Sequence, residues 1–65
     1  MNQKEIRAAF WESHPGADAE ARQRRTRSKS QNYQAAWIRC SFVNFVDDLH
    51  RAGQITDNQA HRVTL

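Results

Sequence analysis

The sequence has a single cysteine, Cys40, and no apolar run that approaches the roughly 20 residues needed to span a membrane. One cysteine excludes a disulfide within the chain, so we expect a reducing compartment, the cytoplasm. No apolar signal-peptide core follows the first residues, and we expect no membrane contact. A length of 65 residues indicates one domain, close to the lower size limit for folding without a metal or disulfides.

The sequence also lacks the spacings of a metal or catalytic site. His14, His50 and His61 do not follow the spacing of zinc ligands. Cys40 and His50 would lie roughly 15 Å apart on one helix, too far for a nucleophile and its base. No glycine-rich phosphate loop is present. We therefore expect no enzyme, no metal and no cofactor.

The stretch from Ser30 to Ala52 carries the strongest periodic signal and is closed by Gly53. Its apolar residues recur at alternating spacings of three and four, which is the period of a helix. We expect Gly53 to adopt a positive φ, as is common just after the end of a helix. The predicted core combines this helix with residues from other segments: Ile6, Phe10, Ile38, Phe42, Phe45, Val46, Leu49 and Ile55. Phe42, Phe45 and Leu49 should form its densest part.

Three further segments have helical features. Asn2 to His14 is a first helix, with Asn2 and Glu5 as a capping box, and Thr56 to Val63 is a short last one, with Thr56 and Gln59 as its box. Ala17 to Lys29 favours helix but has no large apolar residue, so we expect it to stay solvated and to fray into a linker. The predicted fold is all-α: a small three- to four-helix bundle organised around one long central helix, with residues 17–30 as a basic, flexible segment.

Positive charge is concentrated in residues 17–30, which we call the Arg-rich segment. The net charge is +3, and five cations lie within eight residues: Arg22, Arg24, Arg25, Arg27 and Lys29. We expect these side chains to act through their charge, outside the core, on nucleic acid or on an acidic protein surface.

A second apolar group lies on the opposite side of the central helix and includes Ala36 and Cys40. Either the Arg-rich segment covers it, or it is a contact face for another molecule, since large aromatics among polar residues are typical interface anchors. Trp11 presents the same choice between packing under a neighbouring segment and serving as an exposed anchor. The candidate partner-binding residues are Tyr33, Trp37, Arg39, Val43 and Trp11.

The opening IRAAFWESHP and the C-terminal FVNFVDDLHRAGQITDNQAHRVTL resemble a group of short bacteriophage and prophage accessory proteins. The shared pattern is carried by Arg39, Phe42, Val43, Val46, Asp47, Leu49, Arg51, Gly53, Ile55, Ala60, Arg62, Val63, Thr64 and Leu65. The resemblance covers about half of the chain and includes no catalytic motif. It implies a phage context, in which such small proteins bind a host component or regulate phage genes. The Arg-rich middle departs most from the pattern.

Three functions follow from these features. The first is stoichiometric binding to a host protein or complex, as an inhibitor or modulator that could act against a defence system. The second is a nucleic-acid-binding regulator, supported by the Arg-rich segment and a turn at Gly53 that resembles a helix-turn-helix, although the last helix carries only His61 and Arg62 as basic groups. The third is a structural phage component that assembles as a homodimer or larger through the aromatic face. We favour the first.

Overall fold

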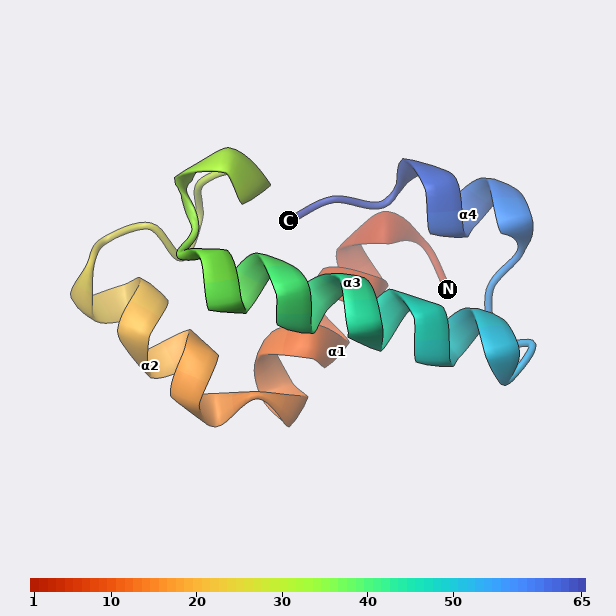
Figure 1. Ribbon diagram of the computed structural model, residues 1–65, viewed down its shortest axis with the longest axis horizontal. Helices are drawn as coiled ribbons and strands as arrows, with labels where there is room; N and C mark the ends of the chain where they lie inside the picture. The colour runs from red at the N-terminus through yellow and green to blue at the C-terminus, as the bar shows by residue number, and fades with distance from the viewer.

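The computed structural model describes residues 1–65, and the chain is all-α, without strands (Figure 1). The all-α prediction is confirmed. The elements are α1 (Gln3–Ser13), α2 (Pro15–Gln23), the short 3-10 helix η1 (Gln31–Tyr33), α3 (Ala36–Arg51) and α4 (Asp57–Arg62). In Figure 1, α3 runs along the long axis in front of α1, α2 lies below one end of α3, and α4 folds back above the other. None of the helices has the length and apolar character required to cross a membrane.

Capping boxes begin α1 and α4 as the sequence predicts. The Asn2 side chain accepts the Glu5 backbone N–H, and the Glu5 carboxylate accepts the Asn2 N–H in return. Thr56 and Gln59 exchange the same two bonds at α4. Each box satisfies backbone donors that the first turn of a helix leaves unpaired.

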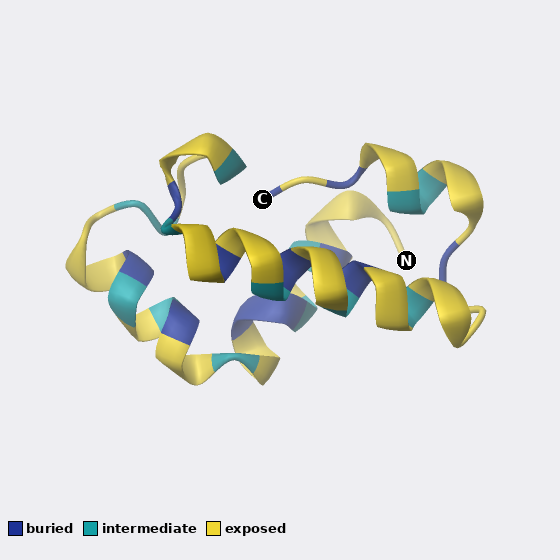
Figure 2. Ribbon diagram, viewed as in Figure 1, coloured by how far each residue is buried: buried dark blue, intermediate teal, exposed yellow.

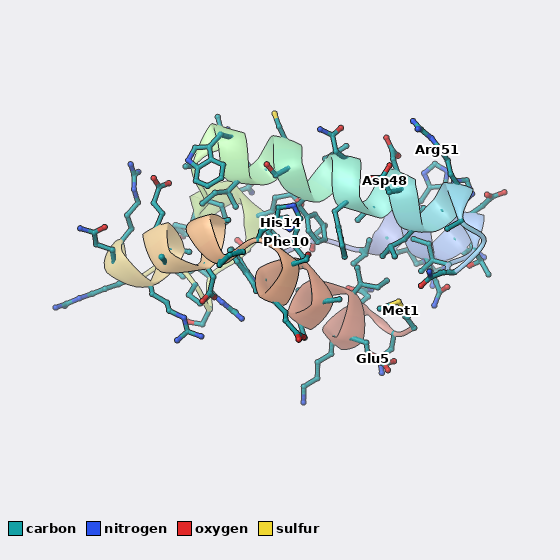
Figure 3. All side chains as sticks on the ribbon, turned by 90° about the horizontal axis from the view of Figure 1, so that it is seen from below. Met1, Glu5, Phe10, His14, Asp48 and Arg51 are labelled. Carbon is teal, nitrogen blue, oxygen red and sulfur yellow. The ribbon has the colours of Figure 1, made fainter.

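A single cluster of buried apolar side chains joins the helices (Figure 2). Phe10 of α1 meets Phe42 of α3 edge to face, with ring centroids 5.2 Å apart. Figure 3 shows Phe10 and His14 between α1 and α3, and their rings are stacked at 4.4 Å. The cluster consists of Ile6, Phe10, Trp11, Ala17, Ala21, Ile38, Phe42, Val46, Ile55, Val63 and Leu65.

Six of the eight predicted core residues are buried, but Phe45 and Leu49 are only half-buried. The buried row of α3 runs through Ile38, Phe42 and Val46 at intervals of four residues. Phe45 and Leu49 lie to one side of that row and pack against the cluster from its border. Their prediction as the densest part of the core, together with Phe42, is wrong, because the helical period defines a broad arc and the neighbouring helix covers only part of it.

The prediction that the helix begins near Ser30 is also wrong. It begins at Ala36, and residues 31–33 form η1 instead. Gln34 has an extended backbone, with φ −85° and ψ 152°, and its side chain is buried. The extended backbone of Gln34 and Ala35 interrupts the helix, and the Gln34 side-chain amide hydrogen-bonds to the preceding loop.

Contrary to expectation, α2 is docked on the rest of the protein. Ala17 and Ala21 are buried, and α2 contacts α1. Small side chains let two helices approach closely, so a segment without large apolar residues can still pack. Pro15 occupies the first position of α2, where its missing N–H costs nothing.

The predicted positive φ of Gly53 is confirmed at +75°. The Gln54 N–H donates to the Leu49 carbonyl and the Gly53 N–H donates to the His50 carbonyl, both at 3.0 Å. This pair of bonds is a Schellman motif, which ends a helix with one residue in the left-handed region.

The same motif ends α2, but an arginine takes the glycine position. The Thr26 N–H donates to the Ala21 carbonyl at 2.8 Å, and the Arg25 N–H to the Arg22 carbonyl at 3.1 Å. Arg25 has a φ of +61° and is the only residue other than glycine with a positive φ. For an L-residue this conformation costs roughly 1–2 kcal/mol.

Replacing Arg25 with glycine should therefore stabilise the protein by roughly 0.5–1 kcal/mol, since glycine adopts positive φ freely but loses more backbone entropy on folding. Urea denaturation of the two proteins measures the difference. Gly53→Ala is the matched control and should destabilise by about 1 kcal/mol through backbone strain alone, because an added Cβ meets no atom within 4 Å. An Arg25→Gly protein less stable than the original would show that the arginine side chain supports the fold.

Candidate functional site

Most of the exposed large apolar side chains lie on one strip, which we call the α3 face: Tyr33, Ala36, Trp37, Arg39, Cys40 and Val43. Tyr33, Trp37 and Val43 are 65, 47 and 50% exposed, and Met1 is the only other large apolar residue at the surface. Residues 17–30 contact this face through Glu20 and Lys29 but leave much of it exposed, so the alternative that the Arg-rich segment covers it holds only in part.

A shallow groove of about 360 Å³ runs along the α3 face. Its walls come from η1 and from the outer side of α3: Gln31, Ala36, Arg39, Cys40, Val43 and Asn44. Arg39 is the one charged residue in this lining. The groove therefore offers an apolar strip with a cation at its side.

Trp37 is held in place by α2. Its Nε1–H donates to the Glu20 carboxylate at 2.9 Å, and Glu20 also pairs with Arg24 at 3.8 Å. The polar edge of the indole is satisfied while much of the ring stays exposed. An anchor fixed before binding loses less conformational entropy when a partner covers it.

The Arg-rich segment is partly neutralised within the chain. Asp18 pairs with Arg22 at 2.8 Å and with Arg27 at 2.5 Å, and Glu20 pairs with Arg24. The hydrogen bonds from Arg27 and then Arg22 hold the pKa of Asp18 below its ordinary value. Their contribution to stability is present at neutral pH and is lost as the pH falls through that lowered pKa.

Trp11 and Arg27 form a structural contact between α1 and the loop after α2. Trp11 is 5% exposed, and the Arg27 guanidinium lies 4.5 Å from the centroid of its ring. Trp11 is thus a core residue, and its alternative as an exposed anchor is wrong. We expected all five cations of the Arg-rich segment to lie outside the core. This expectation is wrong for Arg27, because the turn after α2 brings its side chain over α1.

Gln34 is an important residue that the sequence did not single out. Its Nε2 donates to the Thr26 carbonyl at 2.6 Å and to the Lys29 carbonyl at 3.2 Å, and its Oε1 accepts from the Thr26 hydroxyl at 3.2 Å. These bonds tie the loop that carries Arg27 and Lys29 to the start of α3. A single glutamine between Tyr33 and Ala35 has no pattern that would reveal this role.

Gln34→Ala should destabilise the protein by roughly 1–3 kcal/mol, because it removes the three hydrogen bonds of a buried side chain. Gln23→Ala is the matched control: Gln23 is exposed near the end of α2, and its replacement should change stability by less than ~0.5 kcal/mol. Urea denaturation measures both. Equal effects of the two substitutions would mean that the buried amide does not hold the loop.

No group of three or more histidine, cysteine, aspartate or glutamate side chains is placed to hold a metal ion. His50 contacts the Asp57 carboxylate across the turn between α3 and α4, and His14 packs on Phe10. Cys40 is exposed on the α3 face.

Comparisons of the chain with protein-family models, with curated proteins and with solved structures find no match.

Proposed function

We propose that the protein acts by stoichiometric binding to another protein through the α3 face, in the setting that its sequence resemblance implies: a phage accessory protein that inhibits or modulates a host protein or complex, including a defence complex, in the bacterial cytoplasm. The observation that carries this proposal is the exposure of Tyr33, Trp37 and Val43 on η1 and α3, where Val43 lines the groove, in a chain whose only other exposed large apolar residue is Met1.

The energetics of interfaces support this role for the α3 face. Trp, Tyr and Arg are the residue types that most often dominate binding energy. The face has one of each, in Trp37, Tyr33 and Arg39, and Trp37 is fixed by Glu20. Arg39 is the charged residue of the groove lining, so the complementary surface is apolar with a carboxylate at its side.

The proposal extends to the arrangement of the helices around α3. We take α3 as the element around which a small helical bundle is organised. It contacts α1 with the row of Ile38, Phe42 and Val46, contacts α4 near its end, and presents the α3 face on its other side. The Arg-rich segment by itself is a weaker basis for a function, since three of its five cations are paired within the chain.

Capture of partners from host lysate, treated with nuclease, tests the proposal. Trp37→Ala should weaken binding to a captured protein by at least about 2 kcal/mol, roughly thirtyfold, with unchanged far-UV circular dichroism. His61→Ala, an exposed substitution on α4, is the control and should bind as the original protein does.

Two results would count against the proposal. Undiminished capture by Trp37→Ala would remove the α3 face from the interface. Self-association that sedimentation detects in the original protein and not in Trp37→Ala would assign the face to a second copy of the chain, as in a structural component.

A further inference from the structure

Two neighbouring hollows share Arg27 and Ser28, and the larger one adjoins the α3 face where Lys29 lies over the Tyr33 ring. The larger, of about 540 Å³, lies between α1 and the loop after α2, and the smaller, of about 480 Å³, is lined only by Arg22, Arg25 and the two shared residues. No acidic side chain lines either hollow, and neither shares a residue with the groove. The polar residues of the larger hollow are Lys4, Arg7, Arg27, Ser28, Lys29 and Ser30.

Most of these cations have no anionic partner. Lys4, Arg7, Arg25 and Lys29 form no ion pair with any carboxylate. Arg7 donates instead to neutral oxygens, the Gln3 side chain at 3.4 Å and the Thr64 carbonyl at 3.1 Å. Like charges that lie close together repel one another, and this repulsion destabilises the fold until an anion binds.

Arg27 joins the two hollows and is held firmly. Asp18 binds it on one side and the Trp11 ring supports it on the other. Gln34 in turn holds the loop on which Arg27 and Lys29 lie. The cations from the loop are therefore positioned against those of α1 before any ligand is present.

Arg25 adds an independent observation. It keeps a long basic side chain at a position of positive φ where glycine would be more stable. Backbone strain that persists in this way is found most often at functional sites. The Arg25 side chain lines the smaller hollow, next to the shared Arg27.

We propose that the two hollows form a binding site for successive phosphate groups of a nucleic-acid strand. Lys4, Arg7 and Lys29 hold one phosphate region, Arg25 holds the next, and Arg27 lies between them. Ser28 and Ser30 provide neutral hydroxyl donors of the kind that phosphate oxygens accept. Two adjoining basic hollows suit a chain of phosphates better than a single one. Trp11 is buried beneath Arg27 and offers the bases no stacking surface, and the exposed ring nearest the cations is Tyr33, whose centroid lies 5.3 Å from Lys29 Nζ. The contacts proposed here are to the phosphate backbone and are independent of sequence.

Fluorescence anisotropy with a labelled oligothymidylate of about 20 nucleotides tests the site, in salt from roughly 50 to 200 mM. Lys4→Gln/Lys29→Gln should weaken binding at least about tenfold and reduce the slope of log affinity against log salt by about 1.4, the value for two lost phosphate contacts on a single strand. Arg51→Gln/Arg62→Gln is the matched control: it removes the same net charge from exposed positions outside both hollows and should change affinity less than about twofold.

Arg25→Gly separates binding from folding. It should bind the oligonucleotide more weakly than the original protein and yet melt at a higher temperature, a combination that damage to the fold cannot produce. Trp37→Ala should bind the oligonucleotide unchanged, so this proposal and the protein-binding proposal stand or fall separately.

Three results would overturn the proposal. One is the absence of oligonucleotide binding at the lowest salt. Another is equal weakening by the matched control, which would mean that net charge alone attracts the strand. The third is displacement of the oligonucleotide by pyrophosphate with an affinity as high as that of the strand itself, which would assign the hollows to a small phosphorylated compound.

Discussion

Phe42→Ala is expected to leave the chain largely unfolded at room temperature. The Phe42 side chain is 1% exposed and packs edge to face on Phe10, so its loss removes the main contact between α1 and α3. Truncation of a buried phenylalanine costs about 3–5 kcal/mol. Small domains have little stability beyond that amount, since they bury a smaller fraction of their surface on folding than larger domains do. Far-UV circular dichroism and urea denaturation measure the loss.

Phe45→Ala is the matched comparison, with the same atoms removed one turn away on α3. Its ring centroid lies 5.7 Å from that of Phe10, but the side chain is only half-buried. We expect it to cost clearly less than Phe42→Ala, because part of the ring already contacts water. An equal or larger loss from Phe45→Ala would move the centre of the core toward the border described above.

Trp11→Ala is expected to have an effect of similar size, about 3–5 kcal/mol. The Trp11 ring is buried, meets the Phe10 ring with centroids 5.1 Å apart, and supports the Arg27 guanidinium. Its removal creates a cavity in the core and frees the loop that Arg27 anchors. Thermal denaturation followed by circular dichroism measures the change.

Trp37→Ala is the control, since it deletes the same side chain from an exposed position. It should melt clearly closer to the original protein than Trp11→Ala does, since its cost is limited to the Glu20 hydrogen bond and the packing of a residue that is 47% exposed. Fluorescence gives a second check: a protein that keeps only Trp11 should emit at shorter wavelength than one that keeps only Trp37. The reverse order of emission, or equal melting of the two alanine variants, would contradict the assignment of Trp11 to the core.

The sequence by itself determined the features that depend on neighbours along the chain. The capping boxes of α1 and α4 involve residues three positions apart, and the turn at Gly53 needs one residue that tolerates positive φ. The helical period of residues 36–51 separates Ile38 and Phe42 on one side from Trp37 on the other. Such signals are local, so the all-α class and the exposed face could be predicted from them.

The tertiary structure alone decided the features that depend on contacts between distant residues. A polar Gln34 becomes buried and delays the start of α3 because the loop at Thr26 and Lys29 returns to it. Alanine can dock a helix only where another helix is close enough to reach it. The basic hollows exist because Lys4 and Arg7 of α1 meet a loop more than 15 residues later in the chain. No periodicity or spacing in the sequence indicates which distant residues come into contact, since these contacts follow from how the helices pack.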